Sequence, residues 1–339
     1  MHVLLGRESA QPYDAPVRVV ILGGTRFIGR AVVERLAPDH EVLVVHRGLT
    51  EPLGMPDVRH VHVDRAELGS VRTELREFRP DALVDVSGMS APSARGALDV
   101  FGAELRIVAI SSVDVYRAYA SFHRGIPVEP MPLTELSPRR APEHWYIDRP
   151  DEENVEFEDV YFAAGATVLR LGAVYGPHSD PSRLDFVLRR VRAGRPHIPI
   201  GAGSLRFSRV YVHDVARAVE RAITVGGIGG QAFNVCESDT WDYAEFAAQI
   251  VAAAGSDAEL IRVPGQVLPA DMLITATFRQ DLLADATLGR EVLGWEETDR
   301  VEALEHSVRW ELAHPPANPD LDFGPDDRAL AESPREREP

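Results

Sequence analysis

The sequence of 339 residues contains no lysine, because all 36 of its basic residues are arginine. This excludes every role that needs a side-chain amine: a lysine base, a Schiff-base former or a lysine that clamps a cofactor. The single cysteine, Cys236, excludes an internal disulfide bond and suits a reducing cytoplasm, where we expect the protein to reside. No apolar run approaches the ~20 residues of a membrane-spanning helix, so we expect no membrane partner.

The sequence also lacks a positive balance of charge, since 53 acidic residues give a net charge of −17. A nucleic-acid binder usually needs a basic stripe, because phosphate neutralisation dominates its affinity. We therefore expect no nucleic acid as partner, but a small anionic molecule bound where a few arginines converge. The twelve histidines are scattered and form no HExxH or Cys/His motif, so the sequence predicts no metal site.

Apolar runs alternate with helical periods through the first two-thirds of the chain. Strand-like runs occupy 17–22, 41–47, 81–88 and 105–112, and helical stretches follow several of them. This alternation predicts βαβ units and a parallel sheet that is buried on both faces. We therefore predict an α/β fold, a doubly wound Rossmann sheet with a smaller C-terminal lobe for the substrate.

Composition suggests where these parts begin and end. The apolar start has no basic flank, which argues for a loose extension and against a signal peptide. The end of the chain is rich in Pro, Asp and Glu, as mobile tails are. The predicted parts are an extension (1–16), the NAD(P)-binding sheet domain (17–175), the lobe (mainly 176–313, with 205–235 returning to the sheet domain) and a flexible tail (314–339).

A glycine turn follows the first predicted strand. Gly23, Gly24 and Gly29 permit a sharp turn, the close approach of a pyrophosphate and the packing of helix on strand. Arg26 stands where such fingerprints usually carry their middle glycine. Its guanidinium lies along a pyrophosphate or a 2′-phosphate, or alternatively points to solvent. The predicted cofactor-binding residues are Gly23, Gly24, Thr25, Arg26, Phe27, Ile28, Gly29, Arg47, Asp64, Arg65, Ser87 and Gly88.

The end of the second predicted strand bears on the choice of cofactor. An NAD site usually places an acidic residue there, to hold the ribose 2′-hydroxyl. This chain has His46 and Arg47 instead, and Arg47 suits a 2′-phosphate, so NAD(P) is the expected cofactor with NADP favoured over NAD. Asp64 ends the third strand, where it reaches the adenine amino group or is an ordinary strand end.

Several motifs occur together in a recognisable order. They are "GGTRFIG" (23–29), "ISSVDVY" (110–116), "LRLGAVYGP" (169–177), "RVYVHDVARAV" (209–219), "FNVCE" (233–237) and "FRQDLLADATLGREVLGW" (278–295). This order resembles the extended short-chain dehydrogenase/reductase family of nucleotide-sugar epimerases and dehydratases, in an atypical branch with arginine in the glycine turn. The resemblance covers about residues 17–313. It implies an NAD(P)-dependent oxidoreductase, epimerase or dehydratase that acts on a sugar-like or nucleotide-sugar-like substrate. A homodimer is a possible assembly.

The resemblance also implies roles for individual residues. Ser112 matches the catalytic Ser/Thr, whose hydroxyl binds the substrate oxygen that is oxidised or reduced. Asp114 matches a second acid of the dehydratases, or is an ordinary polar strand end. Tyr146 is the catalytic tyrosine that the resemblance implies. The implied substrate-binding residues are Tyr116, Arg206, Arg209 and Arg279, with surface salt bridges as the alternative for the arginines.

The pattern breaks at the family's lysine, four residues after the tyrosine. Pro150 stands there, and Arg149 is the nearest cation. A tyrosine of pKa ~10 is ionised about one part in a thousand at pH 7, so Tyr146 is a poor base but a usable acid, which favours carbonyl reduction. Alternative acids are Asp114, His144 and Asp148. The missing lysine also motivates an alternative function, a cofactor-binding sensor or assembly partner without turnover, and RNA binding is a third.

Overall fold

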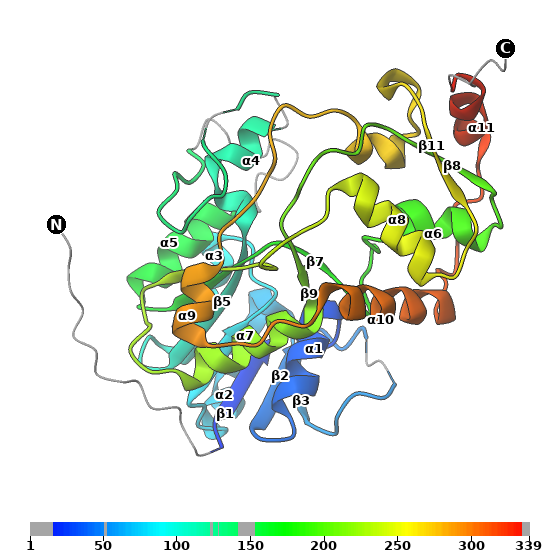
Figure 1. Cartoon of the computed structure of the whole chain (residues 1–339). Coiled ribbons are helices and arrows are strands. Elements are labelled where there is room, and N and C mark those ends of the chain that lie inside the picture. Colours follow the sequence, from blue (N-terminus) through cyan, green and yellow to red (C-terminus); the bar gives the residue numbers. More distant parts are fainter. Residues whose placement is uncertain (1–15, 51–52, 123–124, 128, 142–152, 334–339) are drawn as a thin grey trace, which may run out of the picture.

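A seven-stranded parallel sheet forms the larger part of the molecule (Figure 1). The structure is a computed structural model and describes residues 16–50, 53–122, 125–127, 129–141 and 153–333. The strands, in spatial order, are β10 (Ala232–Val235), β6 (Thr167–Leu171), β5 (Arg106–Ser112), β4 (Ala82–Asp85), β1 (Arg18–Leu22), β2 (Glu41–His46) and β3 (Arg59–His62). Every pairing between neighbours is parallel, which confirms the predicted doubly wound α/β fold.

Helices cover both faces of this sheet, which explains the largely apolar residues of its inner strands, whereas the edge strand β3 is mostly polar. One face packs against α1 (Phe27–Leu36) and α7 (Val212–Thr224). The other face packs against η1 (Arg65–Val71), α2 (Arg72–Glu77), α3 (Ala91–Phe101) and α5 (Asn154–Ala163). Alternate residues of one strand therefore enter different cores: Val19 and Ile21 face α1 and α7, while Val20 and Leu22 lie on the α3 side.

A smaller lobe lies beside the carboxyl ends of the strands, at the upper right of Figure 1. A two-stranded sheet of β7 (Ala173–Tyr175) and β9 (Arg209–Tyr211) leads towards it. The lobe itself contains α6 (Asp185–Arg192), β8 (His197–Ile200), α8 (Tyr243–Ala253), β11 (Glu259–Arg262) and α10 (Arg300–Ala313). Shorter connecting elements are η2 (Val113–Val115), α4 (Arg117–Phe122), η4 (Gly265–Val267), η5 (Ala270–Thr275) and α9 (Thr287–Leu293).

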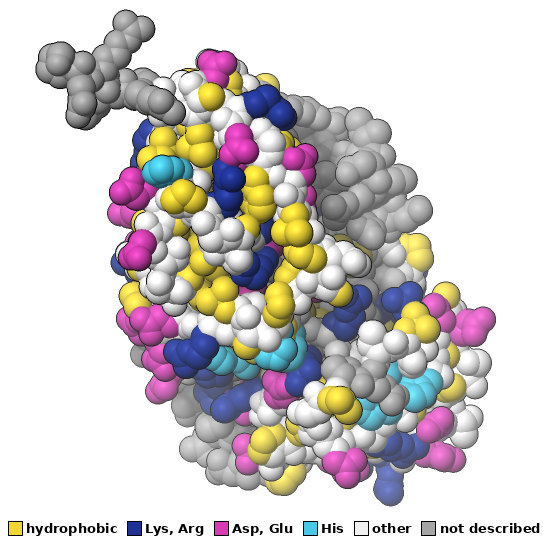
Figure 2. All heavy atoms as spheres, turned by 90° about the vertical axis from the view of Figure 1, so that its right-hand side faces the viewer, with side chains coloured by type: hydrophobic (Ala, Val, Ile, Leu, Met, Phe, Trp, Pro, Cys, Tyr) yellow, Lys and Arg dark blue, Asp and Glu magenta, His cyan; other side chains and the backbone are white. Residues whose placement is uncertain are grey.

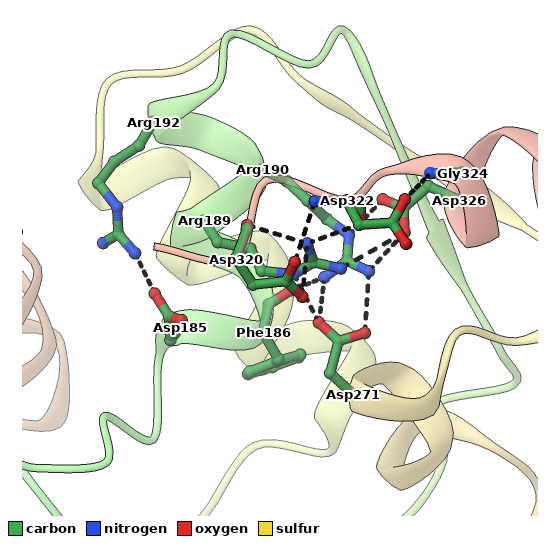
Figure 3. Close-up of polar contacts among 10 residues, drawn as sticks. All are labelled: Asp185, Phe186, Arg189, Arg190, Arg192, Asp271, Asp320, Asp322, Gly324 and Asp326. Carbon is green, nitrogen blue, oxygen red and sulfur yellow. Dashed lines mark hydrogen bonds and ion pairs between the residues drawn. The ribbon is translucent and has the colours of Figure 1, made fainter. Parts of the chain in front are cut away.

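A further helix, α11 (Gly324–Ala331), forms within the segment for which the sequence predicts a flexible tail. Figure 3 shows how ion pairs hold it against the lobe. Arg190 on α6 is fully buried and donates to Asp326, equally buried, through Nε (2.6 Å) and Nη2 (2.8 Å). Asp271 accepts from Arg190 Nη1 at 2.7 Å and from Arg189 Nε at 2.8 Å. A high content of charged residues is typical of disordered segments. In this segment, however, the charged side chains hold α11 against the lobe.

The described part of the chain holds no helix that is long and apolar enough to cross a bilayer. Figure 2 views the molecule from the right-hand side of Figure 1. Basic and acidic side chains are interspersed over the face that it shows, and they form no continuous basic stripe there.

Candidate functional site

The turn between β1 and α1 depends on its glycines. The backbone of Gly23 has φ +90°, and a Cβ on Gly24 would lie 2.7 Å from a methyl carbon of Val44. A Cβ on Gly29 would lie 1.8 Å from the carbonyl oxygen of Gly23. The first turn of α1 therefore packs directly on the turn. No side chain caps its N-terminus, so the free backbone N–H groups suit the phosphates of a dinucleotide.

A pocket of about 440 Å³ lies over this turn and the ends of the neighbouring strands. The predicted cofactor residues that line it are Gly23, Thr25, Arg26, Arg47, Asp64, Arg65 and Ser87. Lining residues that the sequence analysis did not select include His46, Leu49, Thr50 and Leu68. The pocket follows the carboxyl edge of the sheet from β3 to β4, and Ser112 ends β5, the next strand along. A dinucleotide laid along this edge would bring its far end towards Ser112.

The other predicted cofactor residues lie beside this pocket. Phe27 lines a second pocket of about 470 Å³, which shares Thr25, Arg26 and Thr50 with the first and extends to α10. Gly88 donates its N–H to Asp85 Oδ1 at 3.0 Å, and Ile28 packs against the core under α1. These residues shape the turn and its surroundings, and they do not line the 440 Å³ pocket.

The cations of the first pocket have different partners. Arg26 lines the pocket and pairs with Asp180 (Nη2–Oδ2 2.6 Å), and both side chains are exposed. Arg65 donates to buried Asp85 (Nη1–Oδ1 2.6 Å). Burial lowers the pKa of Arg65, but the ion pair with Asp85 outweighs it and keeps that pKa above its ordinary value. Arg47 is exposed and has no partner within the described residues, which leaves it available to an anion.

Asp64 has a structural partner of its own. Its carboxylate accepts a hydrogen bond from the N–H of Ala66 (2.9 Å) and caps η1. It also lines the pocket, so both interpretations of this residue fit its position. A cap leaves a carboxylate with a second oxygen for another donor.

Two hydrogen bonds connect three polar residues, Ser112, Asp114 and Asn154, at the end of β5. Ser112 Oγ accepts from the N–H of Asp114 (3.2 Å), and Asp114 Oδ1 accepts from Asn154 Nδ2 (3.0 Å). Ser112 and Asp114 are half-buried, while Asn154 is buried at the start of α5. Sequence reasoning missed Asn154, because nothing near it in the chain points to a partner 40 residues away. Tyr146, His144, Asp148 and Arg149 lie outside the described residues.

Tyr116 lines neither of the two pockets described above. Its side chain is fully buried. Its hydroxyl donates a hydrogen bond to Asn234 Oδ1 (2.6 Å) and accepts one from Arg170 Nη1 (3.1 Å). Burial raises the pKa of Tyr116 to about 12, although Arg170 opposes that rise. The ring turns inward because β6 and β10 present these two buried polar partners. The expectation that Tyr116 binds substrate is therefore replaced by a role in joining β5, β6 and β10.

The three predicted substrate arginines have separate surroundings. Arg206 is exposed and pairs with Asp281 (Nη2–Oδ2 2.7 Å). Arg209 is buried, lies 4.0 Å over the ring of Phe246 and donates to the carbonyl oxygen of Trp241 (2.8 Å). Arg279 is exposed without a partner among the described residues. The contacts of the described structure therefore do not gather them around one anion.

The fold also brings together three histidines that are scattered in the sequence. His46 ends β2, and His60 and His62 lie on β3, with His46 opposite His62 in the register. Each histidine offers one ring nitrogen, and these three nitrogens lie within 4.8 Å of one another. The available signal was the spacing His-x-His, which puts two side chains on one face of a strand. It becomes informative only once β2 and β3 are known to be neighbours.

Comparisons with known proteins bear on the family and the fold of the chain. The model of a family described as the NAD dependent epimerase/dehydratase family matches residues 19–130 and 153–236. Among curated proteins, the chain is 24% identical over 299 residues to 2′-dehydrokanamycin reductase from Streptomyces kanamyceticus. That match covers 86% of this chain and 79% of the reductase.

Solved structures share the architecture at low sequence identity. A UDP-glucose 4-epimerase from Thermotoga maritima superimposes with a TM-score of 0.68 at 18% identity, over 87% of this chain and 99% of its own. A dTDP-glucose 4,6-dehydratase from Bacillus anthracis, solved with NAD, gives 0.67 at 17% identity, over 88% and 97%. At such identities the likeness shows the fold alone.

Proposed function

Since the chain belongs to the NAD-dependent epimerase/dehydratase family, we propose that it is an NAD(P)-dependent enzyme that reduces a carbonyl group on a sugar-like substrate. The observation that carries the proposal is the pocket over the glycine turn, lined by Thr25, Arg26, Arg47 and Asp64. Its uncapped helix N-terminus and close-packed glycines fit a dinucleotide. The family includes epimerases and dehydratases, and both begin with the same hydride transfer.

The direction of reduction rests on two points. A catalytic tyrosine without a neighbouring lysine keeps its proton near pH 7, so it serves a carbonyl as an acid better than it serves an alcohol as a base. The relative from Streptomyces kanamyceticus is by its name a reductase of 2′-dehydrokanamycin. We extend this to the present chain as a preference for a ketone on a sugar or amino sugar, including nucleotide-linked sugars.

The residues at the end of β5 have distinct tasks in this proposal. The dinucleotide supplies the hydride. Ser112 donates a hydrogen bond to the substrate oxygen and orients the carbonyl carbon. Asn154 holds the carboxylate of Asp114 (3.0 Å) beside Ser112, where Asp114 serves as a proton donor or relay if Tyr146 does not.

Arg47 supports the preference for NADP over NAD. It lines the pocket at the end of β2, has no partner among the described residues, and no acidic residue follows that strand directly. Arg47→Ala should weaken NADP binding about tenfold and leave NAD binding within about twofold, because one charge-assisted contact to the 2′-phosphate is lost. Titration calorimetry with both dinucleotides measures this. The control is Arg72→Ala, which removes an exposed arginine of α2; equal losses for NADP and NAD in Arg47→Ala would contradict the preference.

Turnover is the second test. Oxidation of NADPH should follow the addition of a keto sugar from a panel that includes oxidised aminoglycosides and nucleotide-linked keto sugars. Ser112→Ala should lower kcat by two orders of magnitude or more while the dinucleotide still binds. Tight dinucleotide binding with no turnover across the panel would favour the alternative function, a sensor or assembly partner. RNA binding that survives physiological salt would favour the third.

The proposal also includes an anionic substrate, a cytoplasmic location and a homodimer. Light scattering of the purified chain measures the last of these directly.

A further inference from the structure

His46, His60 and His62 meet beside the wall of the dinucleotide pocket. Parallel pairing of β2 with β3 sets His46 opposite His62, and the two-residue spacing sets His60 on the same face as His62. His46 is buried and lines the pocket, His60 is half-buried, and His62 is exposed. The cluster is therefore anchored in the sheet on one side and open to solvent on the other.

From this juxtaposition we propose that the three imidazoles bind a divalent transition-metal ion such as Zn²⁺. Zinc takes imidazole nitrogens at about 2.0–2.1 Å, so two nitrogens on one ion lie about 3.4 Å apart. His46 Nε2 and His60 Nδ1 are 2.9 Å apart, and the three rings offer nitrogens within 4.8 Å of one another. With buried His46 held in place, rotation of the His60 and His62 side chains closes this triangle around an ion, with water as the fourth ligand. Three imidazoles suit zinc, nickel or copper, whereas calcium and magnesium prefer oxygen.

Binding of the ion also changes the adjoining turn. Gly48 donates its N–H to His46 Nδ1 (3.2 Å), so the proton of neutral His46 sits on Nε2 and points at His60. When Nε2 binds the metal, that proton must move to Nδ1, where it would face the N–H of Gly48. The turn at Gly48 must then rotate, which a glycine at φ +71° can do.

This rotation couples the metal to the dinucleotide pocket. Arg47, Leu49 and Thr50 flank Gly48 and line the pocket, as His46 itself does. The metal-bound turn no longer presents the same wall to the adenosine end of a dinucleotide. The metal therefore antagonises dinucleotide binding, and by linkage the dinucleotide weakens the metal by the same factor. This second step rests on the proposed function, whereas the metal site does not.

The metal site is tested without any dinucleotide. Untagged full-length protein, stripped with a chelator, is titrated with Zn²⁺ by calorimetry and with Co²⁺ by visible absorption, which reports the coordination number. We expect one saturable site, low-coordinate cobalt spectra, and affinity that weakens in acid, because protons compete with the metal for imidazole nitrogens. His60→Ala and His62→Ala should each weaken binding at least about tenfold. His197→Ala, which removes an exposed histidine of β8, is the matched control.

Two results would overturn the site: no saturable binding at millimolar Zn²⁺, or equal affinity in the wild type, His60→Ala and His62→Ala. The antagonism is tested next, by titrating NADP with and without saturating Zn²⁺. We expect a weaker apparent affinity for NADP with Zn²⁺, and no effect of Zn²⁺ in His60→Ala, which lies outside the pocket lining. Unchanged NADP affinity in zinc-loaded wild type would overturn the antagonism. Saturable zinc binding in a protein that binds no dinucleotide would leave the metal site standing and refute the proposed function.

Discussion

At the scale of single residues, the glycine turn explains how arginine replaces its middle glycine. The backbone of Arg26 is extended (φ −132°), and its side chain reaches outward to Asp180. A side chain at Gly29 has no room, since a Cβ there would collide with the carbonyl oxygen of Gly23. The two positions are thus unequal: one tolerates a long side chain and the other tolerates none.

Gly29→Ala should therefore destabilise the protein by about 2 kcal/mol or more and impair dinucleotide binding, because backbone on both sides must move. Urea unfolding gives the stability, and calorimetry gives the affinity. Gly96→Ala is the control: it lies inside α3, a Cβ there meets nothing within 4 Å, and helix propensity predicts a gain of up to about 1 kcal/mol. Similar losses in both variants would contradict the special role of Gly29.

Residue chemistry also marks how far the sequence alone could predict the site. The glycine turn, Ser112 and the pocket-lining Arg47 follow from local patterns, and the structure brings the turn and Arg47 to one pocket. Asn154 and the inward turn of Tyr116 could not be predicted, because their partners lie on elements 40 or more residues away. Such contacts depend on which strands become neighbours, and no local signal records that.

At the scale of elements, the strands were predictable and α11 was not. Continuous apolar runs such as 19–22 and 42–45 have no stable place except inside a covered sheet. Helix α11 has few apolar residues, and its docking depends on a buried ion pair between Arg190 and Asp326. A composition of this kind resembles a disordered tail until the buried arginine on α6 is known.

Asp326→Asn should lower the free energy of unfolding by about 3 kcal/mol, since it removes one of two counter-charges from a buried guanidinium. Urea unfolding measures the loss. Asp327→Asn removes an exposed partner of Arg195 and should cost less than about 1 kcal/mol. The double variant Arg190→Met with Asp326→Leu should recover much of the loss; no difference between Asp326→Asn and Asp327→Asn would show that burial of the pair is unimportant.

At the scale of the whole molecule, two glutamate side chains, Glu237 and Glu311, are buried outside the cofactor pocket. Glu237 follows β10, and Glu311 lies on α10, where it accepts a hydrogen bond from Ser182. Burial raises the pKa of each carboxyl to about 7. Below that pH the folded chain holds protons that the unfolded chain, with an ordinary carboxyl pKa of about 4.3, has already lost.

The two glutamates should therefore lower the free energy of unfolding as the pH rises from about 4.5 to about 7, because the folded state binds their protons in that window. Each glutamate contributes to this fall at about 1.4 kcal/mol for each unit of its pKa shift. Urea unfolding at pH 6 and pH 8 measures it. Glu311→Gln, which keeps the shape without the charge, should flatten the dependence. Equal slopes in the variant and the wild type would remove Glu311 from this account.

The buried thiol of Cys236 can report on local opening of the structure. Its thiol is fully buried in the apolar cluster that joins η2 and α4 to residues 282–286, and burial raises its pKa to about 12. An exposed thiolate attacks an alkylating reagent, so the intact molecule resists such reagents and reacts only while this apolar cluster opens and exposes Cys236. The rate of alkylation of this single thiol therefore reports how often the cluster opens. A ligand that holds η2 and α4 against residues 282–286 should slow that rate.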